Sequence, residues 1–156
     1  MPETTSLELV ETIFVSHAKT ISAHPELSHI IRSTLLPFLI KKFPEKRSFP
    51  VILRITRLMY LIVRNHIDLF PAECEAVLQS FNHVLDQGEA ALNWKRVLCM
   101  EVFRGIFSEP RLLLQIYASF DEQENGKPIL RTCMAGFVRL ASEKQSLIGL
   151  GQLRPF

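Results

Sequence analysis

Apolar side chains recur at helical spacing along almost the whole chain, and the pattern is clearest over residues 93–121. The first half of this segment repeats its apolar positions every four residues, at Leu98, Val102 and Ile106. Residues four apart lie on one face of an α-helix. A break near Pro110 separates this run from a leucine-rich one. We therefore expect a helical hairpin, with Asn93 as the N-cap of its first helix and Ser108 as the N-cap of its second.

Prolines mark most of the expected helix starts. Five of them head an apolar run: Pro25, Pro50, Pro71, Pro110 and Pro128. In the first turn of a helix the missing amide hydrogen costs nothing and the fixed φ is favourable. A capping box of Thr5 with Glu8 marks one further start. The predicted helices cover residues 6–22, 25–42, 50–67, 71–86, 93–107, 110–120 and 128–147.

The predicted helices differ in how much of their circumference is apolar. The first has one apolar side, formed by Leu9, Val10, Ile13, Phe14, His17 and Ile21. The helix over 50–67 is apolar on most sides, which is typical of a central helix covered by several neighbours. Pro37 lies inside the helix over 25–42, where it removes a hydrogen bond. We expect a bend near Ser33 or Thr34 there, without a break.

The order of these helices predicts an all-α fold. Helix starts recur roughly every 20 residues, so helix pairs recur within the range of HEAT and armadillo units. Short connections make consecutive helices antiparallel neighbours. We expect a right-handed armadillo/HEAT-like α-solenoid of about seven helices, in which each pair covers the next. A globular bundle of the same helices is the alternative.

Composition favours one domain with a sizeable core. The chain has 156 residues, of which 47% are hydrophobic, and a chain of this length buries roughly two thirds of its unfolded surface. Its three cysteines are odd in number and lie in helical patterns, which favours buried thiols in a reducing compartment. The sequence shows neither a signal peptide nor a run long enough to span a bilayer, so we expect a cytoplasmic protein. Because Leu7 opens an amphipathic helix almost at once, we expect residues 1–156 to be one domain of a much larger protein.

The sequence offers little catalytic chemistry. Its glycines match neither the P-loop nor the dinucleotide fingerprint. His24 and His29 are five residues apart, which misses the four-residue spacing of a zinc pair on a helix. Nothing local activates the thiol of Cys99 or Cys133. We therefore expect a non-enzymatic protein with no catalytic residue, cofactor or metal.

Basic residues form one candidate surface. The net charge of +2 is too small to indicate a nucleic-acid binder. Arg54, Arg57 and Arg64 recur at helical spacing in the helix over 50–67. Four further cations that precede this helix could extend the ridge: Lys41, Lys42, Lys46 and Arg47. Such a ridge would suit an acidic partner or anionic lipid heads, and a solvated face with internal ion pairs is the alternative.

Trp94 and Asp121 are the other candidates. Tryptophan is enriched in binding hot spots, but beside a helix start it more often packs its helix onto the preceding one. Asp121 follows the sixth helix, where a carboxylate is unfavourable against the helix dipole unless it accepts hydrogen bonds from the next loop. Our hypothesis is that Asp121 holds the loop of residues 121–128, or fastens an adjoining domain.

Residues 93–121 also resemble a known family. The family pattern is a tryptophan-led helix, a short break and a leucine-rich helix, and the matching residues are Trp94, Arg96, Leu98, Glu101, Val102, Glu109, Pro110, Leu112 and Leu113. This pattern is similar to the HUS region (homology upstream of the Sec-seven domain) of large Golgi Arf exchange factors and of the non-catalytic Mon-two (Ysl-two) scaffolds. Tyr117 to Asp121 falls where the family carries its HUS box. The exchange-factor box reads roughly Asn-Tyr-Asp-Cys-Asp, and of it only the aromatic Phe120 and the aspartate Asp121 remain, which favours the Mon-two branch.

The resemblance implies a function and a site. It implies a protein-interaction scaffold in endosome-to-Golgi traffic, peripheral on trans-Golgi and endosome membranes. It also implies a Dopey-type protein, a phospholipid flippase and an Arf-like small GTPase as partners. Tyr117, Phe120 and Asp121 would form a HUS-box-like domain interface. The alternative is the regulatory upstream domain of an active Arf exchange factor, which a Sec-seven domain after Phe156 would indicate.

Overall fold

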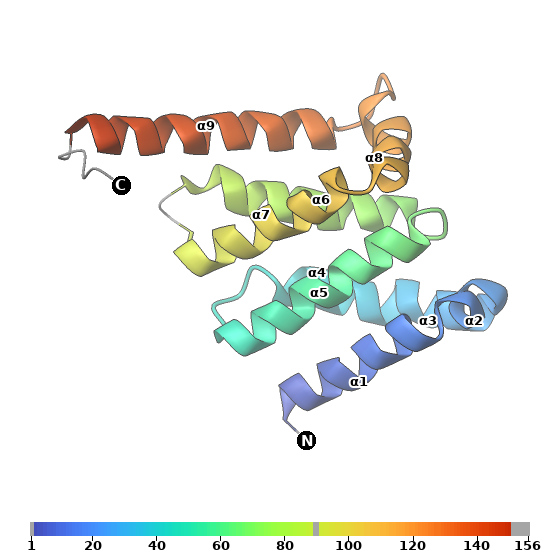
Figure 1. Cartoon of the computed structure of the whole chain (residues 1–156). Coiled ribbons are helices and arrows are strands. Elements are labelled where there is room, and N and C mark those ends of the chain that lie inside the picture. Colours follow the sequence, from blue (N-terminus) through green and yellow to red (C-terminus); the bar gives the residue numbers. More distant parts are fainter. Residues whose placement is uncertain (1, 89–90, 151–156) are drawn as a thin grey trace.

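The computed structural model describes residues 2–88 and 91–150 of the chain, with side chains up to Glu143. Within these residues the regular secondary structure is entirely helical, and no strand is present (Figure 1). The all-α class predicted from the hydrophobic pattern is therefore confirmed.

The helices follow one another with short connections. In chain order they are α1 (Glu3–Ser16), α2 (Ala18–Ala23), α3 (Pro25–Ile30), the π-helix η1 (Ile31–Leu35), α4 (Leu36–Lys42), α5 (Phe49–His66), α6 (Pro71–Asp86), α7 (Asn93–Phe107), α8 (Pro110–Ile116), the π-helix η3 (Tyr117–Asp121) and α9 (Ile129–Leu150). The bounds predicted for α6 and α7 agree with the structure. The last helix was predicted to end at residue 147, and α9 ends three residues later, at Leu150.

The helices stack in two layers (Figure 1). Helices α1, α5 and α7 lie side by side in one layer, and α4, α6 and α9 lie side by side in the other. Helix α5 also contacts α4 and α6 across the layers, and α6 contacts α7. Helix α8 and η3 connect the end of α7 to the start of α9. The described part of the chain is thus an all-α, solenoid-like stack, whereas the armadillo/HEAT type and its hand stay predictions.

Helix α5 is the central helix that its apolar circumference predicts. It packs against α1, α4, α6 and α7. Its buried residues are Val51, Ile52, Ile55, Thr56, Leu58, Met59, Ile62, Val63 and His66. The hydroxyl of Thr56 donates to the carbonyl oxygen of Ile52 at 2.7 Å, so this buried polar group is satisfied inside its own helix. The core continues between α4, α6 and α7, where the ring of Phe81 makes edge-to-face contacts with Phe43 and with Phe103.

The first predicted helix differs most from the structure. It is divided at His17, which is exposed and separates α1 from α2. Its buried face holds Leu7, Glu11 and Phe14, while Leu9 and Ile13 point outward. The predicted buried face was therefore wrong at Leu9, Ile13 and His17, whereas Val10 packs partly buried against the core and Phe14 and Ile21 are buried as predicted. The reason is the carboxylate of Glu11, which turns toward the arginines of α5.

Pro37 disturbs its helix where the sequence predicts. The segment stays helical from Pro25 to Lys42, but residues Ile31–Leu35 form a π-turn. Pro37 has no amide hydrogen to donate to the carbonyl of Ser33, and the turn widens there.

Three predicted caps are wrong. Asn93 is the first residue of α7, and Leu92 is the N-cap, whose carbonyl accepts the amides of Lys95 and Arg96. Ser108 is the C-cap of α7 and donates its hydroxyl to the carbonyl of Arg104. Helix α1 begins at Glu3 after Pro2, so the capping box that we placed at Thr5 does not form.

Candidate interaction surfaces

The three arginines predicted to form a basic ridge do lie along α5, but each is neutralised by another helix. Arg54 contacts Glu8 at 2.7 Å and Glu11 at 3.2 Å, both from α1. Arg57 contacts the other oxygen of Glu11 at 3.1 Å. The internal ion pairs left open as the alternative are therefore present along this part of α5.

Arg64 lies farther along the same helix. Its guanidinium contacts Glu109, the residue that precedes α8, at 2.7 Å. The arginines of α5 thus link it to α1 on one side and to the α7–α8 junction on the other. They do not form an uncompensated basic ridge, because every one of them has a carboxylate partner.

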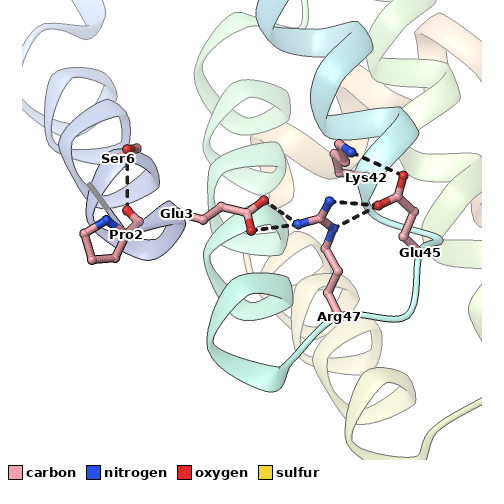
Figure 2. A network of polar contacts seen from close by, with 6 residues as sticks. All are labelled: Pro2, Glu3, Ser6, Lys42, Glu45 and Arg47. Carbon is pink, nitrogen blue, oxygen red and sulfur yellow. Dashed lines mark hydrogen bonds and ion pairs between the residues drawn. The ribbon is translucent and has the colours of Figure 1, made fainter.

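Two of the cations that precede α5 belong to a second network (Figure 2). Arg47 donates to both oxygens of Glu3, at 2.6 and 2.7 Å, and it also donates to Glu45 at 3.0 Å. Lys42 contacts the other oxygen of Glu45 at 3.4 Å. The hydrogen bond from Arg47 is the largest cause that lowers the pKa of the Glu45 carboxyl. The network ties the start of α1 to the α4–α5 loop.

Asp121 caps the start of α9. Its oxygen Oδ1 accepts the amide of Leu130, and Oδ2 accepts the amide of Arg131, each at 3.0 Å. The first amides of a helix have no partner within it, and a carboxylate there also meets the positive end of the helix dipole. The two bonds close the loop between Asp121 and α9, as one form of our hypothesis requires. Fastening of an adjoining domain stays a prediction.

The residues around Asp121 explain how it reaches α9. The amide of Glu122 donates to the carbonyl of Tyr117 at 2.9 Å, which is the five-residue spacing of a π-turn. Gly126 in the following loop passes close to the backbone, since a Cβ atom there would collide with the carbonyl of Phe120. A wide turn and a glycine thus bring the chain back within reach of the carboxylate.

The three HUS-box-like residues do not share one surface. Phe120 is 4% exposed and belongs to the core, so it is not available to an adjoining domain in this structure. Tyr117 is 49% exposed. Direct contact with an adjoining domain therefore stays a prediction for Tyr117 and for the partly exposed Asp121.

Trp94 has a packing role. Its ring lies edge-on to Phe49 of α5, with ring centroids 5.4 Å apart. The sequence predicts packing onto the preceding helix, α6, and the aromatic partner comes instead from α5. The two starts of α5 and α7 are thereby held side by side.

Large apolar side chains remain exposed on the outermost helices, which the sequence analysis missed. Leu9 and Ile13 on α1 are 53% and 51% exposed. Met134 and Val138 on α9 are 52% and 64% exposed. Each pair is four residues apart, so each forms a short apolar strip on one helix face. The spacing was visible in the sequence, but Leu9 and Ile13 were read as part of a buried face, and Met134 and Val138 were not singled out.

The cysteines are buried thiols, as predicted. Burial raises the pKa of Cys74, Cys99 and Cys133 to about 12, so each is protonated near neutral pH. None of them is an activated nucleophile.

The described residues form neither a metal-binding cluster nor a membrane-spanning helix. No group of three or more His, Cys, Asp or Glu side chains is placed to hold a metal ion. No described helix is both long enough and apolar enough to cross a bilayer.

The structure is therefore that of an all-helical module with exposed apolar strips on its two outermost helices, α1 and α9. Residues 1–129 match the Sec7-like HUS family model, described as the HUS domain of Mon2/Sec7/BIG1-like proteins, and the chain belongs to this family. No solved structure gives a significant match to the chain.

Several curated relatives carry the Mon2 name. The fission yeast Schizosaccharomyces pombe "Protein MON2 homolog" is 36% identical over 95% of this chain. "Protein MON2" of Saccharomyces cerevisiae is 23% identical over 80% of it, and the human "Protein MON2 homolog" is 24% identical over 84%. The chain spans only 8 to 9% of these relatives. It is similar to the HUS region of Mon2, as its sequence pattern indicates.

Proposed function

We propose that this chain is a non-enzymatic interaction segment of a Mon2-type scaffold acting in endosome-to-Golgi traffic. The observation that carries the proposal is the match of 95% of the chain to a Mon2 homologue, together with the HUS family model. The exposed strips on α1 and α9 support it, because contiguous apolar surface at the ends of a helical stack suits docking. The segment works by presenting these surfaces to other proteins.

The proposal includes partners and a location. A Dopey-type protein, a phospholipid flippase and an Arf-like small GTPase are the expected partners. The expected location is the cytoplasmic face of trans-Golgi and endosome membranes, by peripheral attachment. These assignments rest on the family, and the exposed strip of Leu9 and Ile13 is the surface that we expect to contact a partner.

A chimera tests the proposal. The matching segment of the fission yeast MON2 homologue is replaced by this chain, and the location of the tagged chimera and its co-precipitation of the Dopey-type protein are measured. We expect both to be retained. A matched chimera with Leu9→Glu and Ile13→Glu alters only exposed side chains and should lose part of the co-precipitation. A chimera that is correctly folded, diffuse in the cell and free of the partner contradicts the proposal.

The family description also includes the Sec7 and BIG1-like proteins, so a second candidate function is regulation of an Arf exchange factor. This candidate predicts that the segment changes the rate of nucleotide release by a catalytic domain in the same polypeptide. Nucleotide release from Arf by the parent protein, measured with and without this segment, separates the two. The Mon2 names of the relatives favour the scaffold.

A further inference from the structure

Two grooves flank the outward side of α6. The first lies between α4 and α6 and has a volume of about 520 Å³. Its walls include apolar side chains such as Ile40, Phe43 and Val84, and the polar side chains of Gln79, His83 and Lys95. This groove therefore combines an apolar surface with hydrogen-bonding groups and a positive charge.

The second groove lies between α6 and the start of α9. It has a volume of about 300 Å³ and is lined in part by Asn82, Lys127 and Ile129. Gln79 and His83 line this groove as well as the first. A segment that crosses α6 would therefore touch both grooves.

The charges around the grooves are not balanced within the described residues. Lys95 is partly buried, and its ammonium group lies 4.6 Å from the ring centroid of Phe43 and donates to the carbonyl of that residue. Neither Lys95 nor Lys127 has a carboxylate within ion-pair distance in the part of the chain that is described. The acidic side chain that lines a groove, Asp86, is already paired with Arg139.

The partial burial of Lys95 has an energetic consequence. Burial lowers the pKa of its ammonium group, which means that the charged form is disfavoured where it stands. A carboxylate brought into the groove would stabilise the charged form, because an opposite charge nearby favours it. An anionic group bound in the groove would therefore interact favourably with Lys95.

Within the described residues, the side chain of Asn82 has a hydrogen-bond acceptor without a partner. The residue is 6% exposed, and its Nδ2 donates to the carbonyl of Ile129 at 3.0 Å. Its carbonyl oxygen Oδ1 is buried without a hydrogen-bond partner. A buried acceptor of this kind is stabilised by a donor, and Asn82 is one of the residues that line the second groove.

We propose that these two grooves bind an extended, acidic peptide segment of a partner protein. The segment crosses α6 at Gln79 and His83, with carboxylates toward Lys95 and Lys127 and apolar side chains on the groove walls. Neighbouring helices lie about 10 Å apart, so the crossing spans about 20 Å and takes about six extended residues. The proposal rests on the interaction role proposed above and names the chemistry of one partner.

A membrane is a less suitable occupant. Anionic lipid heads attract basic side chains that stand out from a surface. Lys95 instead is partly buried and held against Phe43, where it lines the groove between α4 and α6. The experiment nevertheless includes vesicles, because lipid phosphates and peptide carboxylates share their charge.

The experiment selects peptides without assuming a sequence. A phage library of random twelve-residue peptides is panned on the 156-residue chain, and the enriched peptides are synthesised and their Kd measured by fluorescence anisotropy. We expect enrichment of peptides that combine several Asp or Glu with apolar residues. Affinity should fall as salt is raised.

Two charge-changed variants locate the binding. His83→Glu with Lys127→Glu alters exposed groove side chains, and we expect the Kd of the selected peptides to rise at least tenfold. Lys19→Glu with Lys46→Glu changes exposed cations outside the grooves and should leave the Kd within twofold. Circular dichroism checks that both variants are folded.

Two results overturn the proposal: the selection enriches no acidic peptides, or the selected peptides bind the groove variant as well as the parent. If no acidic peptide is selected and the groove variant also loses binding to phosphatidylserine vesicles, the cations are assigned to a membrane instead. Each of these leaves the chimera result unaffected, so failure of the groove is distinguishable from failure of the scaffold role.

Discussion

The contact between α1 and α5 combines buried apolar side chains with a cluster of ion pairs, whereas the contacts among α6, α7 and α9 include a row of edge-on aromatic rings. In the first region Glu11 is 7% exposed and contacts Arg54 and Arg57. In the second, Phe103 is fully buried, with Phe81 and Phe137 edge-on to it at 6.4 and 6.2 Å.

The difference shows how an outer helix can be fixed and still offer apolar surface. A buried ion pair adds little net stability, because desolvation offsets the Coulomb attraction, but it fixes which face turns inward. On α1 the carboxylate of Glu11 takes the inner position, so Leu9 and Ile13 turn outward. The central helices α5 and α6 contact neighbours on several sides, so most of their faces are buried whatever their charges.

The largest expected effect is in the aromatic region. Phe103→Ala should lower the free energy of unfolding by about 3–5 kcal/mol, the usual cost of deleting a buried phenyl ring. Denaturant unfolding measures it. The control is Val97→Ala on the same helix, whose side chain is 54% exposed and which should change stability by less than about 0.5 kcal/mol. Similar losses for both would contradict the packing of Phe103 between Phe81 and Phe137.

The next effect tests the charged region. Glu11→Ala should lower the free energy of unfolding by about 2 kcal/mol, because it removes a buried hydrogen-bonded carboxylate and its ion pairs. Glu8→Ala is the matched control, since Glu8 also pairs with Arg54 but its side chain is 49% exposed. Its effect should stay below about 1 kcal/mol. Equal losses at the two glutamates would mean that burial of Glu11 does not hold α1.

Asp121 gives a smaller expected effect. Asp121→Ala should cost about 1 kcal/mol, the typical value of a lost helix N-cap. Asp121→Asn keeps one acceptor and should cost less. Glu122→Ala, which removes the adjacent exposed carboxylate, is the control. Hydrogen exchange at the amides of Leu130 and Arg131 provides a local readout, and unchanged protection in Asp121→Ala would refute the cap.

The smallest effect is expected in the network of Figure 2. Arg47→Ala should lower the melting temperature slightly at low salt, since it breaks the contacts with Glu3 and Glu45. The loss should disappear at about 1 M salt, where the Debye length is about 3 Å. A loss that is independent of salt would show that Arg47 acts through packing of its aliphatic part.

Particular residues show how far sequence reasoning reached. The start prolines Pro71 and Pro110 and a disturbance of the helix just before Pro37 were predictable, because their causes are local. The carboxylate of Asp121 was recognised as out of place at a helix end, and its hydrogen bonds explain it. The buried face of α1 was mispredicted, because the arginines that attract Glu11 lie 43 and 46 residues away.

The two candidate grooves could not be predicted from the sequence, because their lining residues come from separate elements. Gln79, Lys95 and Lys127 come from α6, α7 and the loop before α9, and each alone is an ordinary polar residue. No local pattern indicates that they share a surface.

The order of hydrophobic and polar residues determined the helices, their approximate ends and the all-α class, because these depend on spacing and on proline within a few residues. The tertiary structure decided which face of each helix is buried, which charges are paired and where grooves open. Those features depend on side chains that are distant in the chain and meet only when the helices stack.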